Sequence, residues 1–164
     1  MKEVGLLTRL TTRYDPVEDR LALDGQLAEN TCRLWLTARL LRQLLPRLFA
    51  WLDDQAGETA AMIAMHRWAQ SRALAEKRPA APVVRSSDQQ GQAWLIDAVT
   101  LQTTSLHLTL RWKVGDSEVA ALRLDARALR QWLEILRHQA EQAGWSDMPW
   151  PVWLTQPERS GTLQ

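Results

Sequence analysis

Apolar and polar residues alternate at the start of the chain and then change to helical spacing. From Val4 to Tyr14 leucines alternate with polar residues in the period of two that is typical of a strand, and the alternation resumes over residues 20–26 and 32–36. From Thr37 onward leucines recur every three or four residues as far as Leu52. This pattern predicts three strands and then an amphipathic helix that Thr37 caps.

A second helix is predicted directly after the first. Pro46 lies inside the first helix, where it removes a backbone hydrogen bond, so we expect a kink or a break into two helices. Gly57 ends that element, and residues 58–77 form the second arm of a helical hairpin. Its stripe at helical spacing consists of Ala61, Met65, Trp68 and Arg72.

The second half of the chain is predicted to have the same order of elements. Strands are expected at 94–101, 105–114 and 118–124, and Asp125 then caps a helix that ends at Gly144. Residues 34–45 and 122–133 are identical at eight of twelve positions without a gap, an internal repeat at an offset of 88 residues.

These patterns predict one α+β domain over residues 1–156, in which an antiparallel β-sheet or sandwich is built from two βββα repeats with an inserted helical hairpin. We expect the repeat halves at 4–54 and 93–143, a helix at 58–77, an exposed linker at 78–92 and a flexible tail at 157–164.

The element order over residues 20–36, 38–77 and 105–142 resembles the head domains of the end-joining and centriole scaffold superfamily. The resemblance implies antiparallel strands that flank a helical hairpin and a last strand that leads into a dimer-forming helix. Here the final helix stops at Gly144 without a heptad continuation, so no long coiled-coil stalk is expected. No motif is shared, and the resemblance carries over no functional residue.

Composition favours a protein of a reducing compartment. The net charge is +1, Cys32 is the only cysteine, and 17 of the 20 basic residues are Arg, as in proteins from GC-rich bacterial genomes. The N-terminus lacks the apolar core of a signal peptide, and the most apolar segment is too short to span a membrane. We therefore expect a cytoplasmic protein with no membrane partner.

No motif for catalysis or cofactor binding is present. His66, His107 and His138 lack the spacing of metal ligands, and no activating base is visible near Cys32. Glycine-rich phosphate loops and nucleophile elbows are absent from the sequence. The sequence thus predicts no catalytic residue, no cofactor, no metal site and no enzymatic activity.

The repeated arginine pairs are the first candidate binding residues. Arg39 with Arg42, and Arg127 with Arg130, occupy the same positions in the two repeats. Arg39 and Arg127 are predicted in first helical turns, where the helix dipole disfavours a cation. Either a carboxylate of the chain offsets this cost, or the residues bind an anion such as a nucleic-acid phosphate or an acidic patch. The candidate carboxylates are Asp15, Glu18 and Asp19 for one copy and Asp97, Asp116 and Glu118 for the other.

The second group of candidates is the tryptophan-rich tail. Trp145, Trp150 and Trp153 lie close to prolines and, together with Trp132 and Trp112, form either a lid on the core or a surface for a partner.

The function favoured by these features is that of a non-enzymatic adaptor or assembly protein, expected to form a homodimer, because the first helix has a wide apolar face and no active-site motif accompanies it. The alternative is a nucleic-acid-binding protein that uses the arginine pairs. A third hypothesis is a small-molecule pocket lined by Met62, Met65 and Trp68.

Overall fold

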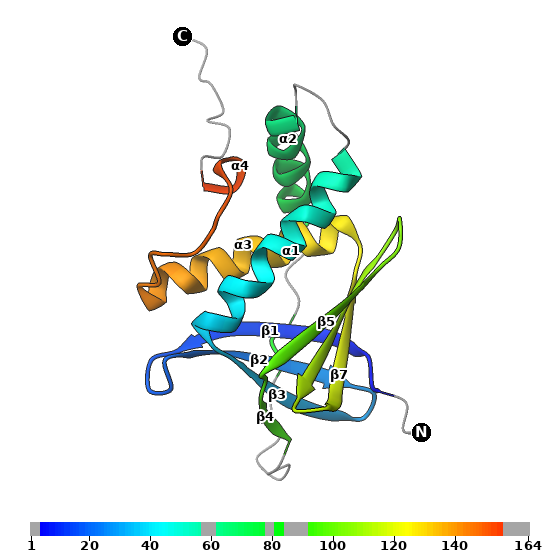
Figure 1. The fold of residues 1–164 in the computed structure, drawn as a ribbon, viewed down its shortest axis with the longest axis vertical. Coiled ribbons are helices and arrows are strands. Elements are labelled where there is room, and N and C mark those ends of the chain that lie inside the picture. Colours follow the sequence, from blue (N-terminus) through cyan, green and yellow to red (C-terminus); the bar gives the residue numbers. More distant parts are fainter. Residues whose placement is uncertain (1–3, 57–61, 78–80, 84–91, 156–164) are drawn as a thin grey trace.

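The computed structural model describes residues 4–56, 62–77, 81–83 and 92–155, and it confirms an α+β fold with two sheets. The helices α1 and α3 lie across the strands, and α2 and α4 stand on the far side of these two helices (Figure 1). The elements are β1 (Leu7–Asp15), β2 (Arg20–Leu27), β3 (Asn30–Leu36), α1 (Ala38–Ala56), α2 (Met62–Ala75), β4 (Ala93–Leu95), β5 (Ala98–Thr103), β6 (Leu108–Val114), β7 (Ser117–Leu124), α3 (Ala126–Ala143) and α4 (Val152–Thr155).

The first sheet has the order β1-β2-β3-β4 and is mixed, not purely antiparallel as predicted. The three predicted strands form an antiparallel meander, whereas β4 pairs with β3 in parallel. The reason is the helical hairpin, since the chain leaves β3, passes through two helices and returns to the same edge in the same direction. β2 also runs through Gly25, where a Cβ would lie 2.4 Å from Leu7 Cδ2, so glycine admits the neighbouring leucine.

The second sheet is the antiparallel meander β5-β6-β7. The single strand predicted over residues 94–101 is in fact two strands in different sheets. The chain changes sheet at Ile96 and Asp97, where the Ile96 amide donates to Trp35 O and the Asp97 amide donates to Lys113 O. Buried Ile96 holds this crossing in the core. A parallel bridge between Leu6 and Ala121 connects the two sheets at β1 and β7.

The helix α1 begins where the sequence predicts, because the Leu40 amide donates to Thr37 Oγ1 at 3.2 Å. It continues through Pro46 to Ala56, so the predicted break does not occur. Its apolar face is buried in the core. Leu40, Leu41, Leu44, Leu45, Leu48, Phe49, Trp51 and Leu52 are all buried.

The helix α3 is closed by the predicted caps. Asp125 Oδ1 accepts from the Ala128 amide at 2.8 Å, and Gly144 adopts a left-handed conformation with φ of 73°. The helix buries Leu129, Trp132, Leu133 and Leu136 against the strands and the neighbouring helices.

The face of α2 that is buried is not the one that carries its predicted apolar stripe. His66, Gln70 and Ala73 are its buried residues, whereas Met65 and Trp68 are exposed. Apolar residues occur on both sides of this helix, so its periodicity does not select a face. The choice is made by α3 and α4, which present a buried arginine and a tryptophan to α2.

Part of the predicted linker contacts the body, although residues 78–80 and 84–91 and the tail from 156 lie outside the described residues. Val83 is buried, its amide donates to Thr11 Oγ1, and Arg9 donates to Ala81 O. Among the described helices, none is long and apolar enough to cross a membrane. Each sheet contains a meander that leads directly into a helix, but equivalence of the two halves as a structural repeat stays a prediction.

Candidate anion-binding site

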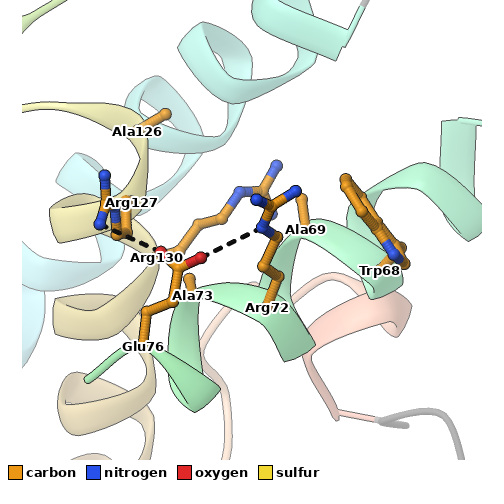
Figure 2. Close-up of a pocket in the computed structure, with 8 residues that line it drawn as sticks. All are labelled: Trp68, Ala69, Arg72, Ala73, Glu76, Ala126, Arg127 and Arg130. Carbon is orange, nitrogen blue, oxygen red and sulfur yellow. Dashed lines mark hydrogen bonds and ion pairs between the residues drawn. The ribbon is translucent and has the colours of Figure 1, made fainter.

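A pocket of about 370 Å³ lies between α2 and the first turns of α3. The helix α2 contributes Trp68, Arg72 and two alanines, Glu76 follows the end of α2, and α3 contributes Ala126 and two arginines (Figure 2). The lining residues are Trp68, Ala69, Arg72, Ala73, Glu76, Ala126, Arg127 and Arg130.

The pocket carries an excess of positive charge. Three of its lining residues are Arg and one is Glu, which gives a formal charge of +2. Glu76 bridges two of the arginines, with Oε1 3.1 Å from Arg72 Nε and Oε2 3.0 Å from Arg127 Nη1. Both guanidinium groups are more than half exposed, so these ion pairs add little stability and leave the arginines accessible to an external anion.

An exposed tryptophan borders this charged surface. Trp68 is 60% exposed, and the Arg72 guanidinium lies 5.3 Å from the centre of its ring. A cation at this distance interacts favourably with the π face. The pocket therefore combines an aromatic ring with the positively charged hydrogen-bond donors of its arginines.

Arg130 is the buried arginine of the pocket. Its residue is only 6% exposed, and among the described residues no carboxylate forms an ion pair with it. Burial lowers the pKa of Arg130 to about 10, opposed by the charge of Asp53, so the group stays protonated at neutral pH. A buried cation without a directly paired anion is costly, and an anion in the pocket would offset that cost.

The guanidinium of Arg130 is held by a buried histidine of α2. Arg130 Nη2 lies 2.9 Å from His66 Nδ1, and Nη1 donates to the His66 carbonyl. Because a guanidinium can only donate, Nδ1 must be the unprotonated nitrogen of the ring. The proton is then on Nε2, which donates to Asp53 Oδ1 at 2.9 Å. The chain Asp53–His66–Arg130 connects α1, α2 and α3 by hydrogen bonds.

The helix α4 covers the His66 and Arg130 side chains of this chain of hydrogen bonds. The Trp153 ring of α4 stacks on His66 at 4.6 Å with an interplanar angle of 11°, and Arg130 lies 5.1 Å from the same ring. Desolvation lowers the pKa of His66, the charge of Arg130 lowers it further, and Asp53 opposes both effects. His66 is therefore neutral at neutral pH, in agreement with the tautomer.

Only two of the four predicted arginines lie in the pocket. Arg127 and Arg130 share the pocket, whereas Arg42 pairs with Asp147 and exposed Arg39 forms no ion pair with a described residue. The partner of Arg127 is Glu76, not one of the strand and turn carboxylates expected for it. The two copies of the repeat thus place equivalent arginines in different surroundings.

The predicted tryptophan group is also divided. Trp145 packs edge-on against Tyr14, and Trp150 and Trp153 pack edge-on against Phe49. Trp153 also stacks on His66. Trp132 lies elsewhere, where it packs on Trp112 and donates to Thr12 Oγ1. All three tail rings therefore contact the body of the chain.

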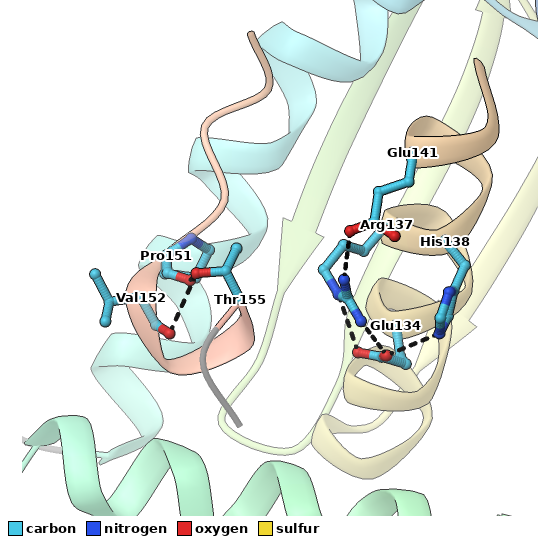
Figure 3. Close-up of polar contacts among 7 residues, drawn as sticks. All are labelled: Glu134, Arg137, His138, Glu141, Pro151, Val152 and Thr155. Carbon is cyan, nitrogen blue, oxygen red and sulfur yellow. Dashed lines mark hydrogen bonds and ion pairs between the residues drawn. The ribbon is translucent and has the colours of Figure 1, made fainter. Parts of the chain in front are cut away.

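The outer side of α3 has a separate polar network. Arg137 pairs with Glu134 at 2.6 Å and with Glu141 at 2.8 Å, and His138 lies 3.2 Å from Glu134 (Figure 3). Hydrogen bonding to Glu134 raises the pKa of Arg137. Figure 3 also shows the turn of α4, in which Thr155 Oγ1 donates to the carbonyls of Pro151 and Val152. These contacts pair Arg137 within α3, so Arg137 is not available to an external anion.

Other candidate chemistry is dispersed. Cys32 is a buried thiol, His107 is exposed, and within the described ranges no three His, Cys, Asp or Glu side chains are grouped to hold a metal ion. A second, mainly apolar hollow of about 620 Å³ lies between β1, β7, α3 and the end of α2. Met62, Met65 and Trp68, the expected lining of a small-molecule pocket, do not line it.

No family profile, curated protein or solved structure matches the chain. Sequence analysis included Arg127 and Arg130 but missed their partners. The sequence showed only that His66 lacks the spacing of a metal ligand, and it gave Asp53 no role. Their contact has no sequence signal because the two residues are thirteen positions apart on different helices.

The neutral His66 predicts a pH dependence of stability. Its pKa is lowered in the folded state, so as the pH falls the unfolded chain takes up the proton first, starting near the ordinary pKa of about 6.5. We expect the free energy of unfolding, measured by urea titration, to decrease below about pH 6.5 until the pH passes the folded pKa.

The matched control uses the exposed histidine. His66→Gln should flatten this part of the profile, and His107→Gln should leave it unchanged. Parallel profiles for the unmodified protein and His66→Gln would contradict the assignment.

Proposed function

We propose that this protein is a non-enzymatic adaptor that binds an acidic segment of a partner protein in the pocket between α2 and α3. The observation that carries the proposal is the convergence of Arg72, Arg127 and buried Arg130 with a single carboxylate, beside exposed Trp68. Arginine and tryptophan are the residues that contribute most often to binding energy at protein interfaces.

The buried leucines of α1 move the expected interface to another surface. The wide apolar face of α1 was the reason for expecting a partner, but the core covers it completely. The exposed large apolar residues of α2 are Ile63, Met65 and Trp68. Trp68 is the one that lines the arginine pocket, so charge complementarity favours an acidic segment that also carries an apolar or aromatic side chain.

The repeat provides a matched pair of variants for the test. Short fluorescent peptides rich in Asp, Glu and Phe are titrated with the protein, and fluorescence anisotropy is measured. Arg127→Gln should weaken binding by about tenfold, the effect of one charge-assisted hydrogen bond, with little change in stability because the residue is exposed. Arg39→Gln, which changes the equivalent exposed arginine of α1, should leave binding unchanged.

Two outcomes would contradict the proposal. If no acidic peptide binds, or if both variants weaken binding equally, the pocket is not the docking site. A cytoplasmic location and self-association into a homodimer are further parts of the proposal.

A nucleic-acid-binding function is the second candidate, favoured by the exposure of Trp68 next to arginines. Bases stack on aromatic rings, and phosphates bind arginine. The same titration with a labelled mixed-sequence oligonucleotide separates the two functions. Binding that falls steeply with salt and is lost in Trp68→Ala would support nucleic-acid binding, whereas an adaptor binds only the peptides.

A further inference from the structure

We infer that the pocket between α2 and α3 takes a phosphate monoester attached to a planar ring, and that its phosphoryl oxygens replace Glu76 on Arg72 and Arg127. The inference rests on the proposed function, since it names the chemistry of the group that the same site binds.

The charge of the pocket matches a dianion better than a carboxylate. The lining residues carry a formal charge of +2. A phosphate monoester carries about −1.5 to −2 at pH 7 and has three strong acceptor oxygens, whereas a carboxylate carries one charge and two oxygens. Glu76 uses its two oxygens singly, one on each arginine, and does not form the bidentate pair that a guanidinium favours. A ligand with three acceptor oxygens can form more hydrogen bonds to these two arginines than the Glu76 carboxylate does.

Buried Arg130 is an independent indication of an anionic ligand. It is held in place by His66 and Trp153, borders the pocket, and forms no ion pair within the described part of the chain. Because His66 Nδ1 is neutral, the contact between His66 and Arg130 does not neutralise the charge. Arg130 is thus a buried cation next to two exposed ones.

The size and shape of the pocket indicate what the phosphate is attached to. About 370 Å³ lies within the range of small-molecule sites and exceeds the space that a phosphate alone requires. Trp68 supplies an exposed aromatic plane beside the arginines. A ring that stacks on Trp68 while its phosphate contacts the arginines fills both parts of the site. Such a ligand is either a phosphorylated aromatic side chain or a nucleoside monophosphate.

Isothermal titration calorimetry with phenyl phosphate and phenyl sulfate tests the charge requirement. The two probes have the same shape but differ by about one negative charge near neutral pH. We expect phenyl phosphate to bind about tenfold or more tightly than phenyl sulfate, Arg127→Gln to weaken this binding about tenfold, and Glu76→Gln to strengthen it. Equal affinities for the two probes, no effect of Arg127→Gln, or no binding of phenyl phosphate at millimolar concentration would overturn the inference.

Two further variants address folding and specificity. Arg130→Met should abolish phenyl phosphate binding, and because this variant changes a buried residue, exposed Arg127→Gln serves as the variant whose folding is not at risk. Arg39→Gln is the control and should bind phenyl phosphate as the unmodified protein does.

Adenosine monophosphate and a short phosphotyrosine peptide identify the source of the group. Tighter binding of the nucleotide than of phenyl phosphate assigns the site to nucleotides, and tighter binding of the peptide assigns it to a phosphorylated partner. Weaker binding of both would overturn the assignment of the ligand to these two sources. If unphosphorylated acidic peptides bind while phenyl phosphate does not, the adaptor function stands and the phosphate inference fails. If only the nucleotide and phenyl phosphate bind, the adaptor function fails and the phosphate chemistry stands.

Discussion

Replacement of Trp153 by alanine should lower the free energy of unfolding by about 3–5 kcal/mol, the usual cost of truncating a large buried aromatic residue. The ring is buried, stacks on His66, packs edge-on against Phe49 and lies over Arg130. Its loss also opens His66 to solvent, and desolvation is the main cause of the lowered pKa of His66. The pKa of His66, followed by NMR of the ring protons, should therefore rise toward its ordinary value.

Trp150→Ala is the control for this prediction. Trp150 belongs to the same tail and packs on Phe49, but it is only half-buried, and the structure shows no ring contact between it and His66. We expect a smaller loss of stability and no change in the pKa of His66. If Trp153→Ala left both quantities unchanged, the tail would not be part of the folded core, and the three tail tryptophans would be available to a partner.

Trp112→Ala should have a comparable effect, about 3–5 kcal/mol, because this side chain of β6 is completely buried and contacts Trp132 of α3. Its ring meets the Trp132 ring edge-on at 6.3 Å, so the substitution removes an aromatic contact and leaves a large cavity at the centre of the core. Urea unfolding measured by circular dichroism gives the difference.

The two rings of this pair differ in hydrogen bonding, which allows a matched comparison. Within the described chain Trp112 Nε1 is buried without a partner, whereas Trp132 Nε1 donates to Thr12 Oγ1 at 3.0 Å. Trp112→Phe removes an unsatisfied donor and should cost less than about 1.5 kcal/mol, while Trp132→Phe should cost about 1 kcal/mol more because it breaks a hydrogen bond. A larger cost for Trp112→Phe than for Trp132→Phe would contradict this interpretation.

Much of the fold could be predicted because local signals specify it. The meander β1-β2-β3 follows from alternation and short connections, and α3 begins and ends at Asp125 and Gly144 because capping is a property of a few adjacent residues. The apolar periodicity of α1 identified the residues of the core, but it could not show that the core of the same chain covers them all. Excess apolar surface on an isolated helix is not evidence of a partner until the rest of the fold is in place.

The elements that were predicted wrongly or missed depend on contacts that are distant in the sequence. The division between β4 and β5 is set by which sheet each half of the segment joins, and both halves have similar strand-forming residues. The helix α4 is four residues long and has no periodic signal of its own. Its position is set by Trp153, which packs on residues of α1, α2 and α3.

The sequence by itself determined an α+β chain of two meanders, each leading into a helix, and the residues of the α1 and α3 core, because these depend on periodicity and on capping within a few residues. Only the tertiary structure decided which face of α2 is buried and which arginines meet. Arg127 and Arg130 converge with Arg72 because α2 packs on the start of α3, while Arg39 and Arg42 of the other repeat lie outside the pocket. The helix α2 has apolar residues on both faces, so contacts with α3 and α4 decide which face is buried. The Arg130 guanidinium and the Trp153 ring hold His66 in the interior, the Arg130 carbonyl accepts from Gln70, and Trp68 is left exposed beside the arginines.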